Sequence, residues 1–234
     1  MTLTVHHLRC SQSERVVFLC EELGIPYTLK TYDRAPILAP PEYKALHPSG
    51  AAPVIQDSSS SSSSSGSDDA PLTLAESGAC MEYISQVHGQ GRLFPSPSHP
   101  SYPDFLYWWH WGNGTLQPSL GRAMMGAAAG LDPANPYVKV FRDRVGTALR
   151  SLDARVRESA WLAGEEFSAA DVMVFFSLTT FRYWYQYSLA EYGGILDYLG
   201  RVSAREAYKR AMEKGDPGME LALGAEPPKP FQAS

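Results

Sequence analysis

A proline at the start of a predicted strand marks the first place in this chain where backbone groups could bind a ligand. The segment reads His47-Pro48-Ser49-Gly50-Ala51-Ala52-Pro53-Val54-Ile55. Proline cannot donate to a sheet ladder, so within sheets it stands at edges, strand starts and bulges. If the Ala52-Pro53 bond is cis, the amide and carbonyl of Ala52 point outward together, and an extended peptide could pair with them. The alternative is an ordinary turn before an edge strand.

An acidic residue and a helix start come together at Glu76-Ser77, where a strand pattern changes into a helix pattern. The free amides of a helix N-terminus hold an anion, and a carboxylate holds an ammonium group. The junction therefore suits a zwitterionic head group. Taken alone, the same two residues are also typical of a simple helix start.

Two residues before the first predicted helix carry reactive groups. Ser11 and Glu14 have the spacing of a capping box, which would give Ser11 a purely structural role as N-cap. Cys10 precedes Ser11, and a cysteine at a helix N-terminus has a lowered pKa and raised reactivity. Cys10 could instead point into the core at the end of its strand.

Alternating strands and helices must position these residues. The patterns predict strands at 3–8, 27–32, 54–56 and 72–74, and helices ending at Gly24 and at His88. This order of elements, with a proline leading the third strand, resembles the thioredoxin-like domain of glutathione S-transferases.

The pattern changes to helices alone from Tyr102 onward. Ser168 stands as an N-cap with Asp171 at the third helical position, and Phe167 and Val172 form a hydrophobic staple. This run resembles the start of the buried central helix in the second domain of glutathione S-transferases. The predicted fold class is therefore α+β, with an N-terminal thioredoxin-like βαβ-ββα domain and a C-terminal all-helical domain.

Composition predicts the boundaries. The first domain is expected at 1–88, a Pro- and Gly-rich linker at 89–100, and the helical domain at 101–234 with a loose tail from Gly215. The serine tract Ser58–Ser65, closed by Gly66-Ser67-Asp68-Asp69, has nothing to bury. It predicts a disordered insertion over 58–69 in a hairpin turn, which the logarithmic cost of loop closure allows.

The resemblance implies glutathione as co-substrate and gives roles to residues already singled out. By position, Ala52 before Pro53 would pair with the tripeptide backbone, while Glu76 and Ser77 would hold its zwitterionic head. In the theta-like branch of the family, the catalytic serine lies four residues before an arginine, as Ser11 does before Arg15.

Cys10 competes with Ser11 for the sulfur. Cys10-Ser11-x-Ser13 resembles the beta-class pattern, and the omega-class cysteine also lies five residues before the arginine. A thiol with a pKa of about 8.5 is only about 3% ionised at neutral pH, and a hydrogen bond from one hydroxyl at a helix start is enough to lower that pKa. Ser11 and Cys10 both remain candidates, with Ser13 as a third.

The chain departs from the family pattern at Ala51, where many members carry Lys, Arg or Gln in contact with the glycine end of glutathione. Loss of a charged hydrogen bond weakens binding by about 1.5 to 3 kcal/mol. Either Lys44 or His47 would compensate, or glutathione would bind weakly, or the site would serve another task.

A second substrate is expected against the helical domain. Tyr107, Trp111 and Thr115 share a helical face, and Met124 lies towards the far end of that helix. Such an aromatic wall suits a flat apolar electrophile. These side chains could equally fill the core or a subunit interface.

Composition narrows the partners. A formal charge of −5 predicts no basic surface for binding nucleic acid, and no apolar run approaches the length of a membrane span. Three cysteines without paired spacing predict neither a disulfide framework nor a metal site and favour a reducing cytoplasm. The resemblance implies a homodimeric glutathione transferase; a glutathione-dependent isomerase or dehydratase and a non-catalytic binding module are the alternatives.

Overall fold

The computed structural model describes residues 2–35, 37–61 and 71–231. The chain divides into two compact units. The first contains the residues up to Arg92 together with 205–219, and the second contains 93–204 together with 220–231.

The first unit is built on a four-stranded sheet in the order β2-β1-β3-β4. Its strands are β1 (Leu3–Leu8), β2 (Thr28–Tyr32), β3 (Val54–Ser61) and β4 (Pro71–Ala75). β1 pairs with β2 in parallel and with β3 in antiparallel register, and β4 continues antiparallel beyond β3. The predicted mixed sheet of a thioredoxin-like domain is therefore confirmed.

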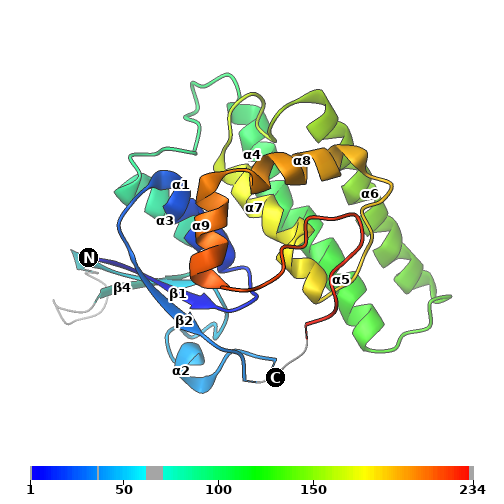
Figure 1. Ribbon diagram of the computed structural model, residues 1–234, viewed down its shortest axis with the longest axis horizontal. Helices are drawn as coiled ribbons and strands as arrows, with labels where there is room; N and C mark the ends of the chain where they lie inside the picture. The colour runs from blue at the N-terminus through cyan, green and yellow to red at the C-terminus, as the bar shows by residue number, and fades with distance from the viewer. Residues whose placement is uncertain (1, 36, 62–70, 232–234) are drawn as a thin grey trace. The chain divides into compact units, whose positions relative to one another are not determined.

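Helices cover both faces of this sheet. They are α1 (Glu14–Leu23), α2 (Pro41–Lys44), α3 (Ser77–His88) and α9 (Glu206–Gly215). Within the unit, α1, α3 and α9 lie on one face and α2 on the other (Figure 1). Leu8 packs in a buried cluster with Tyr43 of α2, so the preceding residue of the strand, His7, faces α1 and α9.

The serine tract begins inside the sheet. β3 continues to Ser61, and the amide of Ser58 donates to the carbonyl of Thr2 at 3.1 Å. The predicted disordered insertion is therefore wrong for Ser58–Ser61, because backbone pairing does not depend on an apolar side chain. The rest of that prediction, 62–69, lies outside the described residues.

The C-terminal helix α9 packs on α1 and thus belongs to the first unit rather than to the helical domain predicted over 101–234. The guanidinium of Arg205 forms a bidentate ion pair with the carboxylate of Glu22 in α1, with nitrogen–oxygen distances of 2.6 and 2.8 Å. Glu21 accepts from Arg210 at 2.9 Å and from Lys214. Both carboxylates are nearly buried, so these pairs offset their desolvation and fix α9 in place.

The second unit is helical. Its elements are α4 (Tyr102–Trp111), the π-helical turn η1 (Gly112–Leu116), α5 (Gln117–Ala128), α6 (Pro136–Glu158), α7 (Ala169–Leu178), the 3₁₀ turn η2 (Thr180–Tyr183) and α8 (Gly193–Ser203). Every residue of α7 is buried, as the sequence predicted for a central helix.

The capping box at the start of α7 is confirmed. Asp171 accepts from the amide of Ser168 at 2.9 Å and also from the amide of Leu162 and the hydroxyl of Tyr198. Burial raises the pKa of Asp171 to about 6, although these hydrogen bonds oppose the rise.

The segment after α9 is held in place, and the prediction of a loose tail from Gly215 is wrong for its described part. The guanidinium of Arg182, which is buried, donates to the carbonyls of Gly224 at 2.8 Å and Ala225 at 2.7 Å. The amide of Phe231 donates to Tyr183 at 2.9 Å. A buried guanidinium needs acceptors, and here the tail supplies them. Among the described residues, no helix combines the length and apolar character needed to cross a bilayer.

Candidate active site

The peptide bond between Ala52 and Pro53 is cis. Pro53 is buried directly before β3, and the carbonyl of Ala52 accepts from the side-chain amide of Gln12 at 2.8 Å. A carbonyl oxygen has two lone pairs, so a second donor can still reach it. This contact ties the proline segment to the loop before α1.

Arg15 joins that loop to the start of α3. Its buried guanidinium donates to Oε1 of Gln12 at 3.3 Å and to Oγ of Ser77 at 3.5 Å. Burial lowers the pKa of Arg15 to about 9, and the neighbouring Glu14 partly opposes this. We call the residues Gln12, Arg15, Ala52 and Ser77 the Arg15 cluster.

The Arg15 cluster connects three segments that are far apart in the sequence. Two of its members, Ala52 and Ser77, were predicted as binding residues. Gln12 was not predicted, and Arg15 was used only as the reference position for the spacing of Ser11 and Cys10. A buried arginine in the first turn of an amphipathic helix is a signal that could have been used, because charges are rarely buried without a role.

Glu76 and Ser77 form the predicted junction between β4 and α3. Glu76 is exposed and has a φ of 78°, a left-handed value that a residue other than glycine seldom adopts. Ser77 is buried as the first residue of α3. The exposed carboxylate beside the first amides of the helix is the arrangement that a zwitterionic head group needs.

The loop between β1 and α1 differs from the prediction. α1 begins at Glu14 with Ser13 at its N-cap, so the capping box of Ser11 and Glu14 is wrong. Oγ of Ser11 instead lies 2.7 Å from Oγ of Ser13 and accepts the Ser13 amide at 3.2 Å. The Ser13 hydroxyl turns toward β1, where it meets both the amide and the carbonyl of Leu8.

Cys10 lies at the tight turn between β1 and this loop, with a φ of 51°. Its amide donates to Oδ1 of Asp216 at 2.9 Å, and its carbonyl accepts from Arg34 at 2.8 Å. Neither partner was predicted from the sequence. Asp216 is 206 residues away from Cys10, and no local pattern links the two. The thiols of Cys10, Cys20 and Cys80 are all buried and form no disulfide.

Lys44 and His47 flank the proline segment. Lys44 is exposed in α2, and its Cγ would lie 3.7 Å from a Cβ placed on Gly50, so the two residues are neighbours. Nδ1 of His47 bonds to Oγ of Ser49 at 2.9 Å. Lys44 therefore presents an exposed cation near Ala51, while one nitrogen of His47 already bonds to Ser49.

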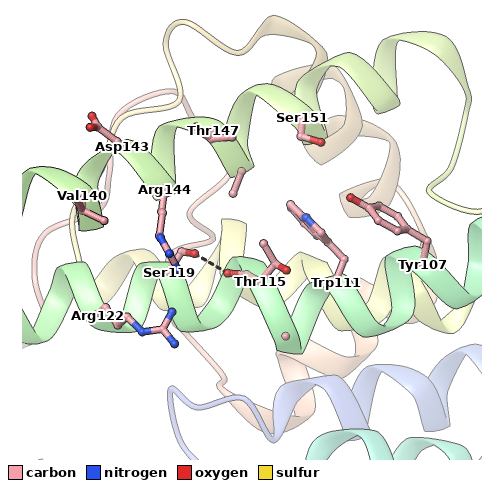
Figure 2. A pocket seen from close by; sticks show the side chains of 12 residues that line it. Tyr107, Trp111, Thr115, Ser119, Arg122, Val140, Asp143, Arg144, Thr147 and Ser151 are labelled. Carbon is pink, nitrogen blue, oxygen red and sulfur yellow. Dashed lines mark hydrogen bonds between the residues drawn. The ribbon is translucent and has the colours of Figure 1, made fainter. Parts of the chain in front are cut away.

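A cavity of about 460 Å³ lies within the second unit, between α4–η1–α5 and α6 (Figure 2). It brings together Tyr107, Trp111 and Thr115 of the predicted substrate wall, but Met124 does not line it. Ring and hydroxyl groups thus share one hollow of a size that suits a small organic molecule.

The π-helical turn η1 shapes this cavity. A Cβ on Gly112 would lie 3.0 Å from Cγ of Met173 and 3.2 Å from Cγ2 of Val174, so glycine lets the turn lie directly on α7. The extra residue of a π-turn shifts the helix face that follows it, and such turns often occur at functional sites. Thr115 enters the cavity from this turn, and its carbonyl accepts from Ser119 at 2.6 Å.

The far end of the cavity is cationic rather than apolar. Figure 2 shows the side chains of Arg144 from α6 and Arg122 from α5 on either side of Ser119, whereas the carboxylate of Asp143 points away from the cavity. The predicted apolar wall therefore occupies only the aromatic end. Among the described residues, no group of three or more His, Cys, Asp or Glu side chains could hold a metal ion.

Comparison with known proteins identifies the class. The family model for the glutathione S-transferase N-terminal domain matches residues 9–87, and the model for the C-terminal domain matches 127–201. The chain belongs to the glutathione S-transferase superfamily.

Individual relatives agree with this placement. Glutathione S-transferase 3 of Schizosaccharomyces pombe is 26% identical over 224 residues, covering 91% of this chain and 87% of the relative. The disulfide-bond oxidoreductase YfcG of Escherichia coli is 27% identical over 180 residues, covering 77% and 80%. A crystal structure of a glutathione S-transferase from Actinobacillus pleuropneumoniae superposes with a TM-score of 0.78 at 29% identity, covering 93% and 94%.

Proposed function

We propose that this protein is a glutathione transferase that ionises the glutathione thiol and directs the thiolate at a small electrophile. The observation that carries the proposal is the Arg15 cluster, in which a buried guanidinium bonds to Gln12 and Ser77 and Gln12 in turn bonds to Ala52, so that the loop before α1, the start of α3 and the proline segment are connected. These are the three segments that an extended, zwitterionic tripeptide would need at once.

The proposed binding mode follows the local geometry. The backbone of Ala52 pairs with the middle of glutathione, Glu76 holds its ammonium group, and the amides at Ser77 hold its carboxylate. Lys44 supplies the cation that Ala51 lacks. Membership of the glutathione S-transferase superfamily supports this reading.

Ser11 is the proposed partner of the sulfur. Its hydroxyl is held by Ser13 on the inner side, which leaves the outer side for a ligand. A hydrogen bond to an anion is worth about 1.5 to 3 kcal/mol, which raises the thiolate fraction at neutral pH from about 3% to between about 30% and 80%. Cys10 is the rival, because its thiolate could attack a disulfide of glutathione, form a mixed disulfide and release one glutathione thiol, which would make the protein a disulfide reductase.

For the electrophile, we propose an apolar body that rests on Trp111 and Tyr107. The aromatic end of the cavity in the second unit supports this assignment. We also propose that the protein is a homodimer, which sedimentation equilibrium would measure.

Steady-state kinetics of two variants test the assignment. Ser11→Ala is expected to lower kcat for conjugation of a generic aromatic electrophile at least tenfold, because the thiolate loses its donor. Cys10→Ala is expected to stay within about threefold of the unchanged protein. If instead Cys10→Ala loses disulfide reduction while Ser11→Ala keeps its conjugation rate, the protein is a disulfide reductase. If neither change slows either reaction tenfold, the proposal is wrong.

A further inference from the structure

A chain of four buried polar side chains leads inward from Ser11. Oγ of Ser11 lies 2.7 Å from Oγ of Ser13, which lies 2.9 Å from Nδ1 of His7. Nε2 of His7 in turn lies 3.0 Å from Oδ2 of Asp216. We call these four residues the His7 chain. His7 and Ser13 are fully buried, and Ser11 and Asp216 are 6% and 5% exposed.

The His7 chain is held from several sides within the first unit. Asp216 directly follows α9, and its second oxygen, Oδ1, accepts the Cys10 amide at 2.9 Å. A Cβ on Gly215 would lie 3.1 Å from Nε2 of His7, so the ring lies against the end of α9. The imidazole therefore has a fixed partner on each nitrogen.

Hydrogen counting sets the directions of the bonds in the ligand-free protein. A carboxylate only accepts, so Nε2 of His7 carries a hydrogen toward Asp216. In a neutral imidazole Nδ1 is then an acceptor, and Ser13 must donate to it. Oγ of Ser13 also lies 3.2 Å from the Leu8 carbonyl, a longer alternative. With its own hydrogen used, Ser13 accepts from Ser11, so Ser11 offers only lone pairs to a ligand.

A thiolate reverses these directions. It needs a donor, so Ser11 must turn its hydrogen outward and accept the hydrogen of Ser13 instead. Oγ of Ser13 can then only accept from His7, which requires a hydrogen on Nδ1 while Nε2–H still faces Asp216. If every bond of the His7 chain is kept, the imidazole is thus protonated on both nitrogens when Ser11 donates to a thiolate.

We propose that His7 is the base that takes the thiol proton of glutathione, through Ser11 and Ser13, and that Asp216 stabilises the resulting imidazolium. This inference rests on the proposed function. The S–H bond breaks, Ser11 accepts that proton and passes its own to Ser13, and Ser13 passes its own to Nδ1. The electron pair stays on sulfur, and the total charge is unchanged.

The surrounding charges are compatible with this transfer. Asp216 contributes a negative charge at the ring, and Arg34, which follows β2, donates to the Cys10 carbonyl and is near enough to Asp216 for their opposite charges to attract. α1 begins with the oppositely charged and buried Glu14 and Arg15. On α9, Lys214 is paired with Glu21 and adds no uncompensated charge. β3 presents no ionisable side chain opposite the end of β1, where Val54 pairs with His6.

The first test measures the ultraviolet absorbance of the thiolate in bound glutathione as pH is varied. His7→Asn keeps a hydrogen-bonding group beside Ser13 but cannot take a proton, so the thiolate fraction at pH 7 is expected to fall at least about tenfold. kcat is expected to fall in proportion to the thiolate fraction, at least about tenfold, and to recover as pH rises above the pKa of free glutathione. KM for glutathione should change less than about twofold, because no binding contact is removed.

Two further measurements keep the proposal testable if His7→Asn does not fold. They are the Asp216→Asn variant and nitrogen NMR of the His7 ring in the unchanged protein. Asp216→Asn keeps the shape of the side chain and is expected to shift the pH profile in the same direction, while Asp216→Glu restores part of the activity. In the unchanged protein, His7 is expected to be the neutral Nε2–H tautomer and to become doubly protonated when glutathione is added.

His88→Asn is the matched control, because His88 also bonds to a buried carboxylate, Asp57, at 2.6 Å in the same unit. It is expected to lower the melting temperature without moving the pH profile. An unchanged thiolate titration in both His7→Asn and Asp216→Asn, with glutathione still bound, would overturn the role of His7 and leave the proposed function intact. If the unchanged protein binds no glutathione, the proposed function and the role of His7 both fail.

Discussion

The ring of His7 lies against Gly215, the last residue of α9, and this contact fixes the position of the ring. Both ring nitrogens are already bonded, to Ser13 and to Asp216. The ring therefore has no direction in which to move if a side chain is added beside it, and close-packed interiors do not absorb such a change without cost.

Gly215→Ala is expected to destabilise the protein by about 1 to 3 kcal/mol, because its Cβ would lie 3.1 Å from Nε2 of His7. Urea unfolding measures this loss. Gly200→Ala is the control: Gly200 lies in α8 with no atom within 4 Å of its Cβ position, and alanine should stabilise that helix by about 0.5 to 1 kcal/mol. Equal stability changes in the two variants would show that His7 is not tightly held.

The residue-scale predictions succeeded where neighbours in sequence decide the structure and failed where distant partners do. The capping box at Ser168 and Asp171 is local, and it formed. The one at Ser11 did not form, because the backbone of Leu8 and the ring of His7 engage Ser13 instead. No sequence window around Ser11 contains Asp216, which completes that arrangement.

At the scale of elements, Asp57 fastens the end of β3 to α3. It is fully buried and accepts from Tyr83 at 2.9 Å and from His88 at 2.6 Å on α3, and from Ser59 within its own strand. Burial alone would raise the pKa of Asp57, but the hydrogen bonds from Ser59, His88 and Tyr83 outweigh it and lower that pKa to about 2.

This carboxylate predicts a specific acid sensitivity. Since the folded pKa lies below the ordinary value of 3.8, Asp57 stabilises the fold fully above about pH 4, and this contribution is lost as pH falls toward about 2. The difference in unfolding free energy between the unchanged protein and Asp57→Asn is therefore expected to be about 2 kcal/mol at pH 6 and to shrink by pH 3. Urea unfolding at several pH values measures it.

Glu206→Gln is the control for that experiment, because Glu206 is an exposed carboxylate paired only with Lys209. Its effect on stability is expected to be small at every pH. A stability difference for Asp57→Asn that stays constant between pH 6 and pH 3 would contradict the account of Asp57.

The elements themselves could largely be predicted from the sequence. Strand periodicity and the stop at Gly24, which has the left-handed φ of 63°, located β1, α1 and β2. The continuation of β3 through Ser58–Ser61 could not be predicted, because serines carry no apolar pattern, and this part of the strand pairs through its backbone with Thr2 and Pro71. The π-turn at η1 likewise depends on the packing of Gly112 against α7.

At the scale of the whole molecule, the chain crosses between its two units more than once. Residues 205–219 return to the first unit and 220–231 to the second. A boundary drawn from composition could not show this, because α9 is amphipathic like the helices of the second unit, and only its tertiary contacts, such as the ion pairs to Glu21 and Glu22, identify it with the first. The return matters for function, since it delivers Asp216 to the loop before α1.

The central claim is that the first unit binds glutathione and ionises its thiol at Ser11. The most direct measurement is a crystal structure of the protein with glutathione bound. We expect the tripeptide backbone beside Ala52, its ammonium group at Glu76 and its sulfur within hydrogen-bonding distance of Oγ of Ser11. A sulfur bonded to Cys10, or a site that stays empty at saturating glutathione, would contradict the account.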